Sequence, residues 1–410
     1  MSKLSLAKDK IPILLLEGIH ENAVEHFRDH GYTNLELLAG ALSEAELIEK
    51  LQGVRMVGIR SRTQLTQAVL DAAPRLISIG CFCIGTNQVD LNSAHHHGVP
   101  VFNAPYSNTR SVAELMIGEM ILLMRGIPEK SALAHKGIWR KSAEGSYEVR
   151  GKILGIVGYG HIGAQLSILA ESMGMQVRFF DVEKKLAIGN AQPCRSLDEL
   201  LHTSDVVSLH VPDTPQTRDM IGTREIERMK PGSILLNASR GTVVDIDALA
   251  DALSREHILG AAIDVFPKEP KAKNEPFESP LKEFDNVILS PHVGGSTQEA
   301  QANIGTEVAE KLVRYSDNGS TVGAVNFVEV ALPVHDDRTR FLHIHRNVTG
   351  IMQHVNEVFS SHELNVAAQY LQTDADVGYA VIDVDGPAPD GTVLQQLRAI
   401  DGTIRARVLL

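Results

Sequence analysis

Cysteine is scarce in this chain, with three residues among 410. Cys81 and Cys83 lie too close along a predicted strand to pair with each other, and Cys194 is isolated. The sequence therefore excludes a disulfide framework and predicts a reducing cytoplasm. Apolar residues never run for 18 positions, and the first ten residues lack the apolar core of a signal peptide. We accordingly expect no transmembrane segment and no membrane partner.

The chain also has no excess of positive charge. The chain has 39 Lys and Arg against 51 Asp and Glu, a net charge of −12, which argues against a nucleic-acid partner. An anionic substrate must then be met by a local basic cluster. The length and the 43% of hydrophobic residues suffice for two or three domains with cores of their own.

A glycine motif follows the apolar run 153–157, which reads as a buried parallel strand. Gly158, Gly160 and Gly163 form G-x-G-x-x-G, and a helix is predicted from there to about residue 173. Gly158 permits the tight turn, Gly160 lets a pyrophosphate approach the backbone, and Gly163 lets the helix pack closely on the strand. The helix N-terminus offers unpaired N–H groups to the anion. The motif predicts dinucleotide binding; the alternative is a plain glycine-rich turn.

Asp181 ends the next apolar run and lies 23 residues beyond Gly158. Its carboxylate is placed to accept hydrogen bonds from an adenosine ribose. Because a carboxylate repels a 2′-phosphate, Asp181 predicts NAD rather than NADP as the cofactor.

Strands and helices alternate over residues 11–105 and again over residues 150–290, which predicts an α/β fold with parallel sheets. We expect a doubly wound dinucleotide-binding domain at 106–297 and a discontinuous, flavodoxin-like substrate-binding domain at 1–105 and 298–332. A capping box, Ser111 to Glu114, is expected to open a helix that runs to about Arg125. Residues 338–410 follow the order β-α-β-β-α-β of a ferredoxin-like domain.

Three ionisable residues follow predicted strands of the dinucleotide-binding domain, namely Arg240, Glu269 and His292. Parallel strands bring their carboxyl ends, where ligands bind, to one edge of the sheet. Hydride transfer from a 2-hydroxy acid needs a base for the hydroxyl proton, and His292 suits that role. Glu269 would orient the imidazole and stabilise its charged form, while Arg240 offers a planar fork to the substrate carboxylate. Taken singly, each could equally be a solvated surface residue.

Arg60 and Arg62 follow a strand of the first domain, two positions apart. Side chains with this spacing share a face of an extended chain, so both guanidinium groups can meet one anion, such as a substrate phosphate. Two solvated charges are the equally weighted alternative. Lys141, two residues after the single tryptophan Trp139, is a weaker candidate for the same cluster; Trp139 itself could be an interface anchor.

His95, His96 and His97 are adjacent, as some metal ligands are. On a helix, consecutive side chains point in different directions, so we interpret them as a solvated helix end and predict no metal.

Four motifs resemble the D-isomer-specific 2-hydroxyacid dehydrogenases: 158–163, 237–241, 264–270 and 290–295. Three further stretches (60–63, 81–87 and 102–105) and the C-terminal unit resemble the branch of that family that oxidises 3-phosphoglycerate at the start of the phosphorylated route to serine. The resemblance covers essentially the whole chain. It implies the same roles for Arg240, Glu269 and His292, a homotetramer, and a side reaction that reduces 2-oxoglutarate to 2-hydroxyglutarate.

The resemblance also implies cofactor contacts along the carboxyl edge of the dinucleotide-binding domain. Besides the three glycines and Asp181, the implied positions are His161, Ile162, Ala238, Ser239, Arg240, Asp264, His292, Val293, Gly294 and Gly295.

The last unit resembles an ACT regulatory domain, which in this family binds L-serine between paired subunits. The matching positions are His345, Asn347 and Asn365. The sequence departs from the family pattern at Thr349, where proline is usual, and at Asp336-Asp337, where close relatives have Gly-Gly. We therefore expect serine feedback of altered strength. The rival hypothesis for the whole chain is a non-enzymatic NAD(H)-sensing scaffold of the same fold.

Overall fold

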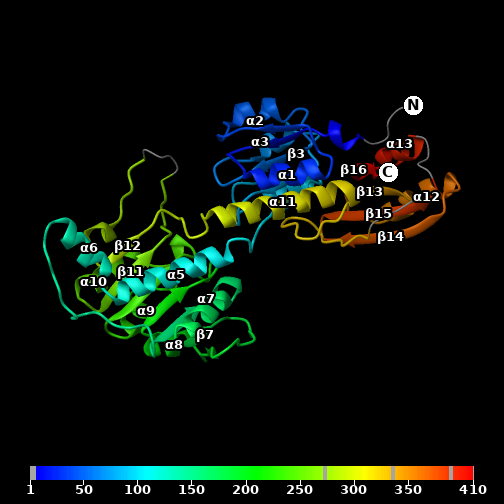
Figure 1. Cartoon of the computed structure of the whole chain (residues 1–410). Coiled ribbons are helices and arrows are strands. Elements are labelled where there is room, and N and C mark those ends of the chain that lie inside the picture. Colours follow the sequence, from blue (N-terminus) through cyan, green and yellow to red (C-terminus); the bar gives the residue numbers. More distant parts are fainter. Residues whose placement is uncertain (1–5, 271–274, 334–337, 387–390, 410) are drawn as a thin grey trace. The chain divides into compact units, whose positions relative to one another are not determined.

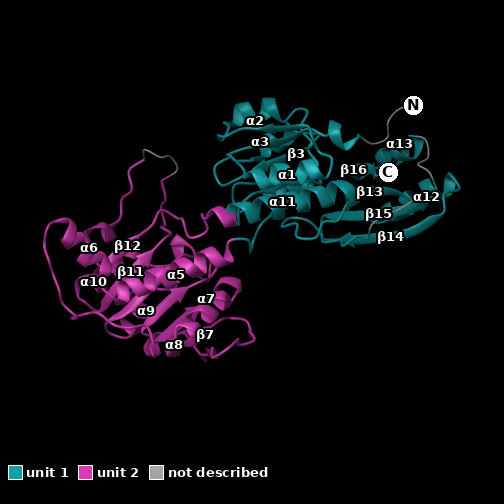
Figure 2. Cartoon of the chain, viewed as in Figure 1, with its two compact units in different colours: residues 1–107, 301–410 teal, residues 108–300 magenta. Residues whose placement is uncertain are grey.

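The computed structural model describes residues 6–270, 275–333, 338–386 and 391–409 (Figure 1). The chain divides into two compact units, one made of residues 1–107 and 301–410 and the other of residues 108–300 (Figure 2). The three domain boundaries expected above remain predictions.

Seven parallel strands form one sheet in the unit of residues 108–300, in the order β12-β11-β10-β9-β6-β7-β8. They are β6 (Ile153–Val157), β7 (Gln176–Phe180), β8 (Gln192–Pro193), β9 (Val206–Leu209), β10 (Ser233–Asn237), β11 (Ile258–Ile263) and β12 (Val287–Leu289). The chain order reverses between β6 and β9, which is the doubly wound pattern of Rossmann domains. The predicted fold class is confirmed.

Helices pack on both faces of this sheet. On one face lie α5 (Thr109–Met124) and α7 (His161–Ser172), and on the other α8 (Leu197–Thr203), α9 (Thr223–Arg228) and α10 (Ile246–Ser254). The helix α6 (Ile127–His135) follows α5 and has no buried residue. Two short 3-10 turns, η2 (Gly241–Val243) and η3 (Pro280–Glu283), lie between strands. Leu235 belongs to one apolar core and Leu236 to the other, so β10 is buried on both faces. That is why its sequence is an unbroken apolar run.

The first sheet of the other unit is parallel, in the order β2-β1-β3-β4-β5. Its strands are β1 (Ile13–Leu15), β2 (Leu35–Leu37), β3 (Met56–Ile59), β4 (Ser78–Cys81) and β5 (Val101–Asn103). Its helices are η1 (Lys8–Lys10), α1 (Glu21–Asp29), α2 (Glu44–Lys50), α3 (Gln67–Asp71), α4 (Leu91–His96) and α11 (Gln298–Asn318). A β-carbon on Gly80 would lie 2.8 Å from side chains of Val308 and Leu312, so this glycine lets α11 pack against β4. The strand order is the flavodoxin-like one that we expected.

Four antiparallel strands, in the order β14-β15-β13-β16, form the last sheet. Its elements are β13 (Arg338–Arg346), α12 (Ile351–Ser361), β14 (Val366–Thr373), β15 (Val377–Asp385), α13 (Thr392–Ala399) and β16 (Thr403–Leu409). The predicted β-α-β-β-α-β order is confirmed. Asp336 and Asp337 of the expected hinge, and most of the expected turn at 386–391, lie outside the described residues.

The predicted start of α5 is wrong. The helix begins at Thr109, with Asn108 at its N-cap and no capping side chain. Ser111 instead shares a 2.8 Å hydrogen bond with the Thr297 hydroxyl, and Glu114 pairs with Arg110. Because the Ser111 hydroxyl bonds to Thr297, which is distant in sequence, it does not cap the helix. Among the described residues, no helix is both long and apolar enough to cross a bilayer.

Arg340 and Asp383 are opposed on β13 and β15 and form a buried ion pair, with side chains 0% and 3% exposed. Two hydrogen bonds, of 2.6 and 2.7 Å, join them. Because Asp383→Asn would leave a buried guanidinium without its counter-charge, we expect it to lower the free energy of unfolding in urea by about 3–5 kcal/mol.

The matched control is Asp385→Asn, two residues along the same strand. Asp385 pairs with Arg338 at the surface, with side chains 50% and 46% exposed, so its loss should cost at most about 1 kcal/mol. If both variants lost the same free energy of unfolding, burial of the Arg340–Asp383 pair would not be the cause of the destabilisation.

Candidate active site

The glycine turn between β6 and α7 has the geometry that a bound pyrophosphate needs. Gly158 has a φ of +90°, and a β-carbon there would lie 2.3 Å from the carbonyl oxygen of His210. A β-carbon at Gly163 would lie 2.4 Å from the Gly158 carbonyl oxygen, whereas one at Gly160 would meet nothing within 4 Å. Two of the glycines are thus required by packing, and the third keeps space open at the N-terminus of α7.

Asp181 lies directly after β7, with its carboxylate held in place. Its Oδ2 accepts from the Tyr159 N–H at 2.8 Å and its Oδ1 from the Glu183 N–H at 2.9 Å. A carboxylate oxygen accepts more than one hydrogen bond, so capacity remains for a ribose hydroxyl. His161 and Ile162 are the first residues of α7. These residues fit the adenosine half of NAD.

Arg240, Glu269 and His292 lie after β10, β11 and β12, which are adjacent in the sheet. A β-carbon on Gly241 would lie 2.0 Å from the backbone of Phe266, so the segment that carries Arg240 touches the one that leads to Glu269. The three side chains are therefore at one edge of the sheet, and Ala238 and Ser239 lie there too.

His292 and Glu269 form a hydrogen-bonded pair, with Nδ1 2.9 Å from Oε2 and 3.1 Å from Oε1. The hydrogen bond to Glu269 raises the pKa of His292 above its ordinary value, although burial and Arg240 oppose this. Burial opposes ionisation of Glu269, but the hydrogen bond and charge of His292 hold the pKa of this carboxyl below its usual range. The pair leaves Nε2 of the imidazole for a substrate.

The loop that carries His292 is fastened by Asp264, which is 2% exposed. Its carboxylate accepts hydrogen bonds from Ser290 Oγ and from the N–H groups of Val293 and Gly294, at 2.7 to 2.8 Å. Its carbonyl oxygen accepts from the N–H of His292, whose φ of +54° is unusual for a residue other than glycine. Gly295, next in the loop, contacts the side chain of Asn108 so closely that a β-carbon would clash.

Glu119 is a residue that the sequence analysis missed. It is 4% exposed, and its Oε2 has no hydrogen-bond partner in the described chain. It shares a face of α5 with Val112 and Leu115, both within 4 Å of a β-carbon built on Gly294. Burial, and then the charge of Asp264, raise the pKa of Glu119 to about 8. A glutamate within the otherwise apolar stretch 115–124 was the available signal.

Replacement of Glu119 by glutamine should change how stability depends on pH. The folded-state pKa of about 8 lies above the ordinary 4.5, so the wild-type protein loses stability as pH rises through this window, and glutamine does not. At about 1.4 kcal/mol per pKa unit, Glu119→Gln should gain up to a few kcal/mol over wild type between pH 5 and 9, as measured by urea unfolding.

The control is Glu114→Gln on the same helix, where the glutamate side chain is 59% exposed. If the free energies of unfolding of wild type and Glu119→Gln changed with pH in parallel, Glu119 would be ionised in the folded protein between pH 5 and 9.

Arg60 directly follows β3, and residues 61 and 62 form a bend. That both guanidinium groups meet one anion stays a prediction. The bend is held by Glu17, another residue that the sequence analysis missed, which is 4% exposed. Glu17 accepts from the N–H groups of Arg60, Arg62 and Thr63 at 2.9 to 3.1 Å. Burial opposes its ionisation, yet these hydrogen bonds hold its pKa below the usual range. The guanidinium of Arg62 lies 3.5 Å from Glu17 and is 55% exposed.

Lys141 belongs to the other unit, in the exposed loop after α6, and its place in a phosphate cluster stays a prediction. The interpretation of residues 95–97 as a solvated helix end is wrong in part. His95 is half-buried, and its Nε2 lies 3.2 Å from Asp374, while His97 contacts Asp71 at 3.1 Å. Only His96 is exposed. The histidines have separate partners, and no group of three metal-ligating side chains occurs in the described part of the chain.

The predicted effector residues are not gathered within one chain. His345 is 1% exposed and pairs with Gly378 of β15, whereas the carbonyl oxygen of Asn365 accepts from the N–H of Asp385 at the other end of that strand. Seven residues at about 3.4 Å each separate these ends by about 24 Å. Asn347 is exposed and donates to the carbonyl oxygen of Asp374 at 2.6 Å.

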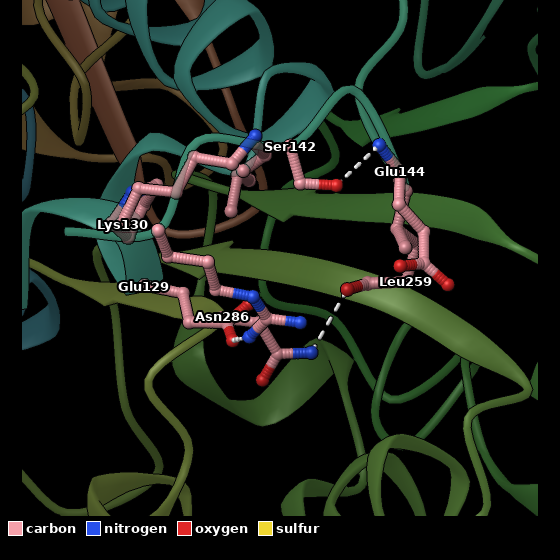
Figure 3. A pocket seen from close by; sticks show the side chains of 11 residues that line it. Glu129, Lys130, Ser142, Glu144, Leu259 and Asn286 are labelled. Carbon is pink, nitrogen blue, oxygen red and sulfur yellow. Dashed lines mark hydrogen bonds and ion pairs between the residues drawn. The ribbon is translucent and has the colours of Figure 1, made fainter. Parts of the chain in front are cut away.

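A pocket of about 90 Å³ lies at the opposite edge of the sheet in the same unit (Figure 3). Its wall includes Leu259, near the start of β11, and Asn286, just before β12; Asn286 donates to the Leu259 carbonyl oxygen at 2.8 Å. Glu129 and Arg140 form an ion pair on its rim. Because ligands of doubly wound sheets bind at the carboxyl ends of strands, this pocket is separate from the candidate active site.

Comparisons with known proteins agree with this geometry. The family model for the D-isomer specific 2-hydroxyacid dehydrogenase NAD binding domain matches residues 117–294, and that for the AHAS small subunit-like ACT domain matches residues 341–405. The crystal structure of D-lactate dehydrogenase from Aquifex aeolicus, complexed with NAD and lactic acid, is similar at 28% identity and a TM-score of 0.63, over 74% of this chain and 95% of that one. Fold, site and family models thus define an NAD-binding 2-hydroxyacid dehydrogenase with a C-terminal ACT domain.

Full-length relatives identify which family of 2-hydroxyacid dehydrogenases the chain belongs to. D-3-phosphoglycerate dehydrogenase of Escherichia coli K12 is 60% identical over 410 residues, 100% of both chains. The enzyme of the same name from Haemophilus influenzae is 59% identical over 408 residues, 100% of this chain and 99% of that one. The chain belongs to the D-3-phosphoglycerate dehydrogenase family, and the expectations of an oxidoreductase and of NAD as cofactor are confirmed.

Proposed function

We propose that the protein oxidises 3-phospho-D-glycerate to 3-phosphohydroxypyruvate with NAD, as the first step of the phosphorylated route to serine, in a reducing cytoplasm. The observation that carries this proposal is the His292–Glu269 pair beside Arg240, at the same sheet edge as the glycine turn. The names of the full-length relatives support the choice of substrate.

In this mechanism, Arg240 binds the substrate carboxylate and polarises the C2 oxygen. Nε2 of His292 takes the C2 hydroxyl proton, and Glu269 stabilises the imidazolium that forms. NAD, when bound, would supply the acceptor for the hydride that leaves C2. In the reverse direction His292 returns the proton to the carbonyl oxygen. Asp264 fixes the loop that carries His292, and its predicted contact with the cofactor stays a prediction.

Arg60 and Arg62 are our candidates for the substrate phosphate, with Lys141 as a weaker one. The buried Glu17 holds the backbone of both arginines, and more than half of the Arg62 side chain is exposed to an anion. A site that binds a carboxylate at one end and a phosphate at the other would also accept a dicarboxylate. We therefore propose slower reduction of 2-oxoglutarate to 2-hydroxyglutarate, a side activity that consumption of NADH would reveal.

The test is the initial rate of NADH formation from NAD and 3-phosphoglycerate, with the keto-acid product trapped. We expect turnover by the wild-type protein and a loss of about 10²–10⁴-fold in kcat for His292→Asn, while NADH binding, followed by fluorescence, stays unchanged. Turnover of lactate but not 3-phosphoglycerate would refute the substrate. A fully active His292→Asn protein would refute the base.

We further propose that L-serine binds between the ACT domains of two copies in a homotetramer and inhibits the enzyme. His345 and Asn365 lie about 24 Å apart along β15, so one chain alone does not offer both to a molecule as small as serine. A two-fold pairing of the sheets would bring His345 of one copy toward Asn365 of the other. Inhibition then requires that serine bind the less active state better.

Asn365→Ala should raise the serine concentration for half-inhibition at least tenfold and leave the rate without serine unchanged. Asn365 is remote from the dehydrogenase residues in sequence, and its side chain donates to Asp385 of the ACT domain. Initial rates over a serine titration measure this. Gln372→Ala, at an exposed position on β14, the strand that Asn365 directly precedes, should respond as wild type does. Unchanged inhibition of Asn365→Ala would remove this residue from the effector site.

A further inference from the structure

Five arginines gather where the ACT sheet meets the first sheet of the same unit. Arg405 and Arg407 are on β16, and Arg398 is on α13. Arg55 directly precedes β3, and Arg75 lies three residues before β4. We call this set the arginine junction. No described Asp or Glu lies within ion-pair distance of any of the five, although acidic residues outnumber basic ones in the chain.

The guanidinium groups of β16 contact backbone carbonyls and a ring instead of carboxylates. Arg405 donates to the carbonyl oxygens of Leu76 at 2.6 Å and His97 at 3.3 Å. Arg407 donates to the carbonyl oxygen of Ser316 at 3.4 Å and lies 5.4 Å from the centre of the Tyr315 ring. His97 is the C-cap of α4, so Arg405 does meet the partial negative charge at a helix end.

Two of the remaining three arginines, Arg55 and Arg398, also donate to backbone carbonyls. Arg55 donates to the Arg75 carbonyl oxygen at 3.4 Å, and Arg398 to that of Ala406 at 3.3 Å. Carbonyl dipoles carry only part of a unit charge, so the positive charges remain largely uncompensated. Burial lowers the pKa of Arg405 to about 10, and the neighbouring Arg407 and Arg55 act in the same direction. Burial and nearby arginines likewise lower the pKa of Arg55.

Donor capacity is left over inside the junction. Nε of Arg405, Nη1 of Arg407 and the hydroxyl of Tyr315 are buried and have no hydrogen-bond partner in the described chain. Asp317, which follows Ser316 on α11, is already bound by Lys8 and by the Tyr32 hydroxyl. Buried donors without acceptors cost stability, and an oxyanion is the acceptor that suits guanidinium groups best.

We propose that the arginine junction binds a small, multiply charged phosphate anion that joins the ACT sheet to the first sheet. This site is distinct from the proposed substrate site. Arg55 lies before β3, whereas Arg60 lies after it, so the two clusters are at opposite ends of the same strand. The shared chemistry is the phosphate group, whether it comes from inorganic pyrophosphate or from the diphosphate of a nucleotide.

The experiment titrates pyrophosphate into the full-length protein by calorimetry, with saturating NADH so that the nucleotide site is filled. We expect saturable binding and a rise in the midpoint of thermal unfolding. The double variant Arg75→Gln/Arg398→Gln removes two exposed members of the junction, so folding is preserved, and binding should weaken at least tenfold. Arg28→Gln, an exposed arginine on α1 in the same unit, is the matched control and should bind as wild type does.

Three results would overturn the proposal: no saturable binding to wild type, equal affinity in Arg75→Gln/Arg398→Gln, or loss of binding in Arg60→Ala/Arg62→Ala, which would assign the anion to the substrate site. Repeating the titration with ADP separates the two sources. Equal affinity for ADP and pyrophosphate means that only the phosphates are recognised, and tighter binding of ADP means that a nucleotide is the ligand; both results support the site.

Discussion

The hydrogen bonds accepted by Asp264 are what the proposed active site depends on. One buried carboxylate holds Ser290, Val293 and Gly294, and the adjacent carbonyl oxygen holds His292 in a left-handed conformation. Glu269 follows the same strand, β11, as Asp264 does. A single strand end therefore fixes both members of the imidazole–carboxylate pair, and their 2.9 Å contact follows from the position of β11 rather than from the long loop between them.

A second carboxyl group beneath this loop has the opposite character. Asp264 is surrounded by donors, whereas Glu119 is buried among apolar side chains with an unpartnered oxygen. Burial, and then the charge of Asp264, raise the pKa of Glu119 to about 8. A neutral Glu119 adds no second negative charge next to the loop that Asp264 fastens. The charge state of a helix residue outside the site thus supports the geometry inside it.

The sequence predicted those parts of the fold whose causes are local. The glycine spacing, the acid after β7 and the residues after β10, β11 and β12 each follow from a short stretch of chain and from how parallel strands align. Glu17, Glu119 and the partner of Ser111 were not predictable in this way, because their partners are brought near only by the tertiary fold. The start of α5 illustrates the limit, since the Ser111 hydroxyl that suggested a cap bonds to Thr297 instead.

Two arginine clusters lie at opposite ends of β3, and they differ in whether a carboxylate accompanies them. At the carboxyl end, the buried Glu17 fixes the backbone of Arg60 and Arg62 and neutralises part of their charge, which suits a site that must release its ligand at each turnover. At the amino end, the arginine junction contacts carbonyl oxygens and the Tyr315 ring but no carboxylate of the described residues, so its charges stay uncompensated without an anion. A ligand there would be held between two sheets that share one apolar core. Its occupancy would act on how the ACT sheet packs, not on the hydride transfer itself.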